Sequence, residues 1–247
     1  MQLEATVAII TGAAQGLGLA FSKLLLENGG SVFMTDINLS QLSTSAQELQ
    51  AQYSSSRIGF QFQDVCDDNS FDVIFDAANN HFGSRKVNLL VNNAGINSEF
   101  FAFYKQSSSW RKLIEINLIA VMRGTQVALR RLPVGSLIVN VASAAGLAPT
   151  PAVPEYGASK VGVVYFTSAV AKKTKDIRVV AFCPAFVDTP MAHSAVQASP
   201  KFVERFGGLM TTEYAAQAFQ RLLQDDTNTG KALFVTNQVV QYQTSKL

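Results

Sequence analysis

The chain has 247 residues, of which 48% are hydrophobic and 15% are charged, and its net charge is +2. The basic residues are scattered, so the chain lacks the electrostatic footprint of a protein that binds nucleic acid or an anionic membrane. No apolar run reaches the roughly 18 residues that a membrane span needs, and no secretory signal opens the chain. We therefore expect a soluble, intracellular protein with one domain over residues 1–247.

Apolar, β-branched runs alternate with helix-like segments along the whole chain, a pattern typical of a parallel sheet built from βαβ units. Amphipathic helices are expected between the strands, for example over residues 17–27 and 71–81. Seven strands are predicted, at residues 6–10, 31–35, 58–63, 88–91, 136–141, 178–182 and 232–235. The fold class is therefore α/β: a single doubly wound domain of the Rossmann type, with a seven-stranded parallel sheet and helices on both faces.

The least regular stretch covers residues 189–212 and mixes Pro, Gly, Ser and apolar residues after the sixth predicted strand. Ligands bind outside the carboxyl ends of the strands in this architecture. The segment is therefore a candidate lid over substrate. An ordinary surface excursion is the alternative.

A glycine-rich turn follows the first predicted strand. The run Thr11-Gly12-Ala13-Ala14-Gln15-Gly16-Leu17-Gly18 passes directly into a predicted helix. Glycines at these positions allow a tight turn and a close approach of the backbone to a pyrophosphate, while the positive end of the helix faces the phosphates. The position between a strand and a helix makes this motif a candidate dinucleotide site.

The second predicted strand ends at Asp36, 18 residues beyond Gly18. A carboxylate there accepts hydrogen bonds from the ribose hydroxyls of the adenosine and repels a 2′-phosphate. The next residue, Ile37, supplies no cation. These residues favour NAD over NADP, although a polar residue that merely closes a strand is the alternative for Asp36.

Two more strand ends carry candidate cofactor contacts. The expected adenine and ribose neighbours are Asp64, Val65, Asn93, Ala94 and Gly95. Asparagine pairs also favour turns for local reasons, so Asn92-Asn93 alone is ambiguous.

The catalytic candidates are Tyr156 and Lys160, which share one helix face because they are four residues apart. A nearby ammonium favours the phenolate and lowers the tyrosine pKa, so the pair is expected to take a proton from a substrate hydroxyl. Ser143 follows the fifth predicted strand and is expected to hydrogen-bond the reacting oxygen. An ordinary surface Tyr/Lys pair and a turn serine are the alternatives.

Taken in order, these motifs resemble the short-chain dehydrogenase/reductase family. The resemblance runs from about Val7 to Val187 and is carried by Thr11-Gly12…Gly16…Gly18, Asp64-Val65, Asn92-Asn93-Ala94-Gly95, Asn117, Ser143 and Tyr156…Lys160. It implies an NAD-dependent alcohol dehydrogenase in which Tyr156 is the general base and Ser143 binds the substrate oxygen.

The resemblance also implies roles for residues that the pattern alone does not explain. Lys160 would hold the nicotinamide ribose, Asn117 would position a water that links Lys160 to solvent, and Val187 and Thr189 would meet the nicotinamide carboxamide. A homodimer or homotetramer would form through helices around residues 110–131 and 156–173. No metal is expected, since the two cysteines, Cys66 and Cys183, lack metal-like spacing and suit buried, reduced thiols.

Within the family, the nearest resemblance is to the branch of NAD-dependent 15-hydroxyprostaglandin dehydrogenases. Val153 departs from that branch, which carries a substrate-contacting glutamine three residues before the tyrosine. This departure argues against a prostaglandin as substrate. The apolar residues expected to line the cleft predict a hydrophobic secondary alcohol, such as a hydroxy-fatty-acid or steroid derivative. The alternatives are a 3-hydroxyacyl-CoA dehydrogenase, a carbonyl reductase and a non-catalytic NAD-binding protein. The expected apolar lining of the cleft is Phe100, Phe101, Phe103, Tyr104, Phe186, Met191, Phe202, Phe206 and Met210.

The last three residues are Ser245, Lys246 and Leu247. A terminal Ser-Lys-Leu is read by the peroxisomal import receptor. The preceding polar stretch, residues 241–244, is expected to leave the tripeptide accessible, which predicts a peroxisomal location, or a cytoplasmic one if the signal is not read.

Overall fold

A computed structural model describes residues 1–243, apart from the side chains of Ser194 and Arg205. One sheet runs through the middle of the molecule, with strand order β3-β2-β1-β4-β5-β6-β7-β8. The strands are β1 (Val7–Thr11), β2 (Ser31–Asp36), β3 (Ile58–Phe62), β4 (Leu89–Asn92), β5 (Leu137–Val141), β6 (Arg178–Pro184), β7 (Ala232–Val235) and β8 (Val240–Gln243). The order reverses direction at β1 and β4, which is the switch point where such sheets bind ligands.

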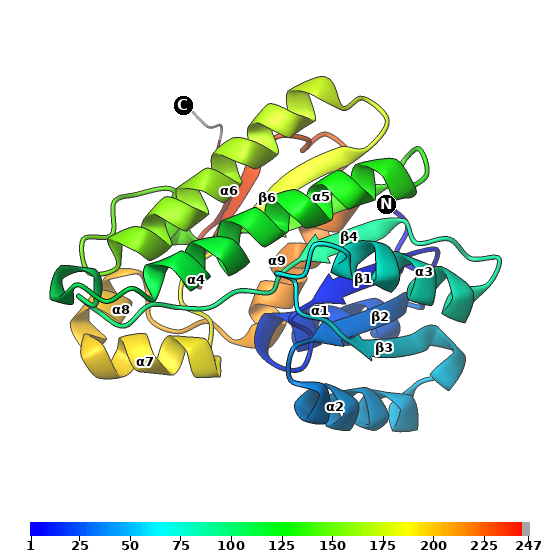
Figure 1. Cartoon of the computed structure of the whole chain (residues 1–247), viewed down its shortest axis with the longest axis horizontal. Helices are drawn as coiled ribbons and strands as arrows, with labels where there is room; N and C mark the ends of the chain where they lie inside the picture. Colours follow the sequence, from blue (N-terminus) through cyan, green and yellow to red (C-terminus); the bar gives the residue numbers. More distant parts are fainter. Residues whose placement is uncertain (244–247) are drawn as a thin grey trace.

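Helices cover both faces of the sheet, as Figure 1 shows, with α5 and α6 in front and α9 behind. They are α1 (Gly16–Glu27), α2 (Leu39–Gln52), α3 (Ser70–Phe82), α4 (Trp110–Ile114), α5 (Ala120–Arg131), α6 (Pro154–Lys173), α7 (Pro190–Ala198), α8 (Pro200–Arg205) and α9 (Thr212–Gln224). A π-helical turn, η3 (Glu115–Ile119), joins α4 to α5. No helix within the described part of the chain is long and apolar enough to cross a membrane.

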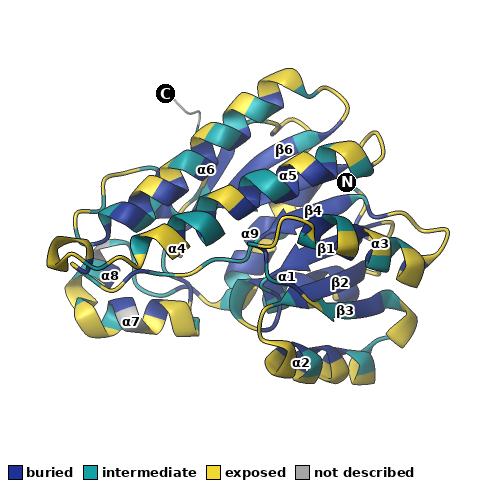
Figure 2. Cartoon of the chain, viewed as in Figure 1, coloured by how far each residue is buried: buried dark blue, intermediate teal, exposed yellow. Residues whose placement is uncertain are grey.

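Side chains alternate between the two faces of the sheet along each strand, which explains why helices must pack on both faces. In β1, Ala8 and Ile10 pack with α1, α2 and α9, while Val7 and Ile9 pack with α3 and α5. All four residues are almost completely buried, as the blue strands in Figure 2 show. A strand that is apolar at consecutive positions can only be stable between two helix layers. The single α/β domain predicted from the sequence is therefore confirmed.

The prediction of seven parallel strands is wrong by one strand, because β8 adds an antiparallel eighth strand against β7. The hairpin closes where the Thr236 amide donates to the Val239 carbonyl at 2.8 Å. The polar sequence of β8 suggested an exposed tail, but an edge strand with one solvated face accepts polar residues. Ser245, Lys246 and Leu247 lie outside the described residues, so the peroxisomal import signal stays a prediction.

The candidate lid, residues 189–212, is more regular than its sequence suggests. It contains α7 and α8, each of which begins with proline at its first turn. Proline suits this position because its missing amide hydrogen is not needed there. Figure 1 shows both helices together at one end of the molecule, beside the carboxyl ends of the strands. The function of the segment as a lid stays a prediction.

Candidate active site

The glycine-rich turn has the geometry that a dinucleotide site needs. Gly12 has a φ of +65°, in the left-handed region that favours glycine. A Cβ on Gly18 would lie 2.3 Å from the Gly12 carbonyl oxygen and 2.7 Å from Asn93 Nδ2, so no larger residue fits there. Gly12 and Gly16 line the cavity at the strand ends, whereas Gly18 is buried beneath the turn and supports it.

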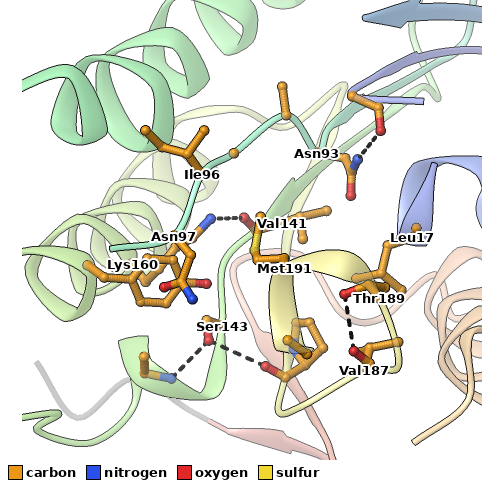
Figure 3. Close-up of a pocket in the computed structure, with 18 of the residues that line it drawn as sticks. Leu17, Asn93, Ile96, Asn97, Val141, Ser143, Lys160, Val187, Thr189 and Met191 are labelled. Atoms are coloured by element: carbon orange, nitrogen blue, oxygen red, sulfur yellow. Dashed lines mark hydrogen bonds between the residues drawn. The ribbon is translucent and has the colours of Figure 1, made fainter. Parts of the chain in front are cut away.

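The first turn of α1 is open toward this cavity. Gln15 occupies the N-cap position, but its side chain makes no capping hydrogen bond, and the first turn contains no acidic residue. Gln15 and Leu17 both line the cavity (Figure 3 shows Leu17). The free amide groups and the positive end of the helix dipole therefore face a space that suits a phosphate.

Asp36 stands at the far end of the same cavity, at the end of β2. Its carboxylate accepts hydrogen bonds from the Ala14 amide at 3.1 Å and the Asn38 amide at 2.9 Å, which fixes its orientation. Ile37 also lines the cavity and is 60% exposed, so it offers an apolar surface beside the carboxylate. Among the cavity-lining residues that the structure describes, only Lys160 is a lysine or arginine. No described lysine or arginine of the cavity lining therefore stands beside Asp36 to accept a 2′-phosphate.

The ends of β3 and β4 complete the cofactor half of the cavity, as predicted. Asp64, Val65, Asn93, Ala94 and Gly95 all line it. The Asn93 side chain donates to the carbonyl oxygens of Thr11 at 2.8 Å and Gly12 at 3.0 Å. Asn93 therefore braces the glycine-rich turn (Figure 3), a role that the local turn chemistry of asparagine pairs did not suggest.

Ser143, Tyr156 and Lys160 line this cavity together. The Ser143 hydroxyl accepts from the Ala145 amide at 3.1 Å and donates to the Pro184 carbonyl at 3.5 Å. Burial raises the pKa of Tyr156, and the hydrogen bond with Ser143 lowers it by less. The expected net lowering of the tyrosine pKa is therefore not found in this structure, because the loss of solvation dominates.

Lys160 lies beneath the tyrosine and is itself buried. Its Nζ donates to the Val141 carbonyl at 3.0 Å and lies 5.7 Å from the centre of the Tyr156 ring. Burial lowers the pKa of Lys160 to about 8, because the loss of solvation disfavours its ammonium form, and the nearby Cys183 opposes this only in part.

Asn117 occupies the π-helical turn η3 and is fully buried. Its side chain pairs with Ile96, accepting from the amide at 2.9 Å and donating to the carbonyl at 2.9 Å. Asn117 does not line the cavity, but its Oδ1 and the Lys160 Nζ both lie against Gly95. These two hydrogen bonds with the Ile96 backbone fix the Asn117 side chain to the segment that follows β4.

The segment after β6 brings Val187 and Thr189 to the cavity. The Thr189 hydroxyl donates to the Val187 carbonyl at 3.1 Å, as Figure 3 shows. A Cβ on Gly16 would meet the Thr189 methyl group at 3.3 Å, so this segment closes over the glycine-rich turn. Both predicted residues therefore reach the cofactor half.

The cavity has a volume of about 460 Å³, and its other half is apolar. Five of the nine residues expected to line the cleft do so: Phe100, Phe186, Met191, Phe202 and Phe206. The other four do not, because Phe101, Phe103 and Tyr104 are exposed and Met210 is buried in the core. Cys183 is buried beneath the site as expected, whereas Cys66 is only half-buried.

Sequence reasoning missed several residues of the site. Ile96, Asn97 and Thr150 also line the cavity, and Glu155 is buried next to Tyr156. The only available signal for Asn97 was its polar side chain two residues after the Asn-Asn-Ala-Gly run. Its orientation depends on contacts with α6, which no local pattern encodes.

Comparison with known proteins agrees with this geometry. The profile of the short chain dehydrogenases matches residues 6–200. The chain belongs to this family. Bovine 15-hydroxyprostaglandin dehydrogenase (NAD+) is 33% identical over 96% of this chain and 92% of its own length. The 3-oxoacyl-(acyl-carrier-protein) reductase FabG of Thermotoga maritima is 30% identical over 97% of both chains.

Solved structures of short-chain dehydrogenases share the fold. A glucose/ribitol dehydrogenase-type member from Brucella melitensis has a TM-score of 0.85 at 26% identity, over 95% of this chain and 96% of its own. A member from Burkholderia phymatum in complex with NAD has a TM-score of 0.83 at 25% identity, over 95% and 90%. An actinorhodin polyketide ketoreductase solved with NADPH has a TM-score of 0.81 at 28% identity, over 94% and 96%. The chain is thus an oxidoreductase of a family whose members use either dinucleotide.

Proposed function

We propose that this oxidoreductase transfers hydride between NAD and a hydrophobic secondary alcohol or its ketone. The observation that carries the proposal is one cavity with three parts. The glycine-rich turn and Asp36, the aromatic rings, and the group of Ser143, Tyr156 and Lys160 all line it.

The residues divide the reaction between them. The substrate hydroxyl lies between Ser143, which holds the oxygen, and Tyr156, which removes the proton. NAD, when bound, accepts the hydride from the same carbon. Oxidation requires the phenolate of Tyr156, and burial raises the pKa of that group. The rate of oxidation should therefore rise with pH, and ketone reduction should be favoured at lower pH.

NAD is proposed over NADP because a negative charge of the protein lies where the 2′-phosphate of NADP would bind. The Asp36 carboxylate, held by two backbone amides, would repel a 2′-phosphate, and the adjacent Ile37 offers no compensating cation. The similarity to an NAD-dependent relative supports this preference. The similar ketoreductase solved with NADPH makes the ratio of NAD to NADP activity the quantity to measure.

The substrate is proposed from the apolar half of the cavity. Phe100, Phe186, Phe202 and Phe206 form a chain of ring contacts, with centroids 5.2–6.4 Å apart. Val153, also in the lining, adds an apolar surface three residues before Tyr156. Such walls suit a lipid-like or steroid-like alcohol.

A substrate panel tests the proposal. Purified enzyme with NAD should form NADH from long-chain secondary alkanols, hydroxy fatty acids or hydroxysteroids, and should do so faster than with NADP. No turnover of any of these alcohols by an enzyme that binds NAD would refute the proposed activity.

A second candidate is reduction of 3-oxoacyl thioesters or other carbonyls, which the similarity to the FabG reductase favours. It predicts faster turnover of 3-oxoacyl thioesters with NADPH than of any alcohol with NAD. The same enzyme preparation, assayed in both directions with both dinucleotides, separates the two candidates.

We also propose that the enzyme works as a homodimer or homotetramer. The helices α5 and α6 lie side by side in Figure 1, and the outer face of α6 carries exposed Val161 and Tyr165. Ile119, which precedes α5, is partly exposed as well. Light scattering should give a mass of at least two chains, and Tyr165→Glu should lower it. A monomeric wild-type protein would contradict this assembly.

A further inference from the structure

The segment that follows β4, residues 93–101, begins beside the glycine-rich turn and forms one wall of the cavity. Ile96, Asn97 and Phe100 line the cavity from this segment. Its far end is fixed to the residues before α6, because the Phe101 amide donates to the Ala152 carbonyl at 2.7 Å. The orientation of the wall therefore depends on α6, the helix that also carries Tyr156.

A buried polar pair lies between this wall and α6. The Ser98 hydroxyl donates to Oε1 of Glu155, and the two residues are only 8% and 6% exposed. Oε2 of Glu155 has no hydrogen-bond partner within the described part of the chain. Burial of a carboxyl group with an unused oxygen is unfavourable, and the N-terminal position of Glu155 in α6 offsets this only in part. An unfavourable group next to the general base indicates a functional constraint.

The pair fixes the residue that precedes Ser98. The Ser98 amide donates to Oδ1 of Asn97 at 2.8 Å. Because a backbone N–H group can only donate, the oxygen of the Asn97 amide must face it, and the NH₂ group points the other way. Nδ2 of Asn97 donates to no other residue that the structure describes, and Figure 3 shows this side chain directed into the cavity, on the side of Lys160 and Ser143. The cavity thus contains an oriented donor that the protein itself leaves unused.

We propose that Asn97 recognises a second oxygen of the substrate, and that Glu155, acting through Ser98, is the residue that positions it. The inference rests on the proposed function, since it requires an alcohol held by Tyr156 and Ser143. The preferred substrate is then a hydrophobic secondary alcohol with a further carbonyl, ester or hydroxyl oxygen close to the reacting carbon. The side chain of Val153, just before α6, has no such donor, so Asn97 supplies this second contact from the segment after β4.

Two matched alcohols test the recognition step: a secondary alkanol, and a 3-hydroxy ester of the same chain length. Asn97→Leu keeps the number and branching of the side-chain heavy atoms and removes the donor, together with the oxygen that accepts from the Ser98 amide. We expect it to lose about tenfold more kcat/KM with the hydroxy ester than with the alkanol, since a lost hydrogen bond leaves the substrate oxygen unpaired. Ser136→Ala is the control, because Ser136 lies outside the cavity and its buried hydroxyl has no hydrogen-bond partner among the described residues. Ser136→Ala should change kcat/KM neither for the alkanol nor for the hydroxy ester.

Variants of the buried pair test the positioning step. Ser98→Ala and Glu155→Val should each show the same selective loss with the hydroxy ester, and the double variant should lose no more than the worse single variant. Glu155→Gln keeps an oxygen that accepts from Ser98 and should recover the hydroxy ester activity to within about twofold. Parallel loss with both alcohols, accompanied by a lower melting temperature, would show that the pair is only structural.

The outcomes separate the two proposals. If the wild-type enzyme oxidises the alkanol but Asn97→Leu affects both alcohols equally or not at all, the inference is wrong and the proposed function stands. If the wild-type enzyme binds NAD but oxidises neither alcohol, the proposed function fails, and the inference fails with it.

Discussion

The two halves of the cavity are built in different ways. The cofactor half consists mainly of backbone: glycines that permit a close approach, open amides at the start of α1, and Asp36 held by two amides. The substrate half consists of side chains from segments far apart in the sequence, with Phe100 after β4 and Phe186, Met191, Phe202 and Phe206 after β6. Backbone geometry fixes the cofactor half tightly, whereas the substrate half can change its selectivity through single side chains. This difference can be tested in each half separately.

The largest effect should follow from Gly18→Ala in the cofactor half. The added Cβ would lie 2.3 Å from the Gly12 carbonyl, so the turn must shift. We expect the Kd for NAD to rise by at least about 100-fold, because a displaced turn removes several charge-assisted contacts to phosphate at once. Isothermal titration checks this.

Gly83→Ala is the control for that variant. Gly83 has a φ of +61° but nothing within 4 Å of an added Cβ. It should lower the free energy of unfolding by about 1 kcal/mol through backbone strain without changing NAD affinity. Equal losses of affinity in the two variants would show that close packing beneath the turn is unimportant.

The second effect concerns the choice of dinucleotide. Asp36→Asn removes the repelling charge, and adding Ile37→Arg supplies a cation for a 2′-phosphate. The ratio of kcat/KM for NAD to that for NADP should fall about tenfold in the single variant and about 100-fold in the double variant. A ratio that stays constant in both variants would show that Asp36 does not select the cofactor.

A smaller effect is expected in the substrate half. Phe202 stacks edge-on against Phe100, Phe186 and Phe206, so Phe202→Ala should raise KM for a long-chain alcohol about tenfold. NAD affinity should be unchanged if the halves are independent. Phe62→Ala, at an exposed phenylalanine outside the cavity, is the control and should leave KM unchanged. A loss of NAD affinity in Phe202→Ala would contradict the claim that the cofactor half and the substrate half are independent.

The smallest effect is on stability and arises from Lys160. Its pKa is about 8 in the folded protein, below the ordinary 10.5, so the unfolded chain binds more protons between these values. The contribution of this group to the free energy of unfolding therefore rises as the pH increases from about 8 to about 10.5. Below pH 8 its burial lowers the free energy of unfolding by the full amount. Lys160→Met should abolish activity yet unfold at the same or a higher temperature at pH 7, with the gap narrowing above pH 8. A melting temperature that is clearly lower at pH 7 would contradict this sign.

The same contrast explains what the sequence could predict. The seven parallel strands and the cofactor residues follow from periodicity and glycine spacing, which are local properties. The antiparallel β8 was missed because a polar edge strand resembles a tail. Asn97 and Glu155 were missed because their positions arise from packing between the segment after β4 and α6. Three expected aromatic lining residues and Met210 were misplaced because burial is set by tertiary packing. The direction of the Tyr156 pKa depended on burial, which spacing along a helix does not reveal.

The most direct test of the central claim measures binding and turnover on the same preparation of Tyr156→Phe. If Tyr156 is the general base in this cavity, NADH formation from a long-chain secondary alcohol should fall by about 1,000-fold or more. The Kd for NAD should stay within about threefold of the wild-type value. Turnover within tenfold of the wild-type rate, with NAD bound normally, would remove Tyr156 from the reaction and contradict the account.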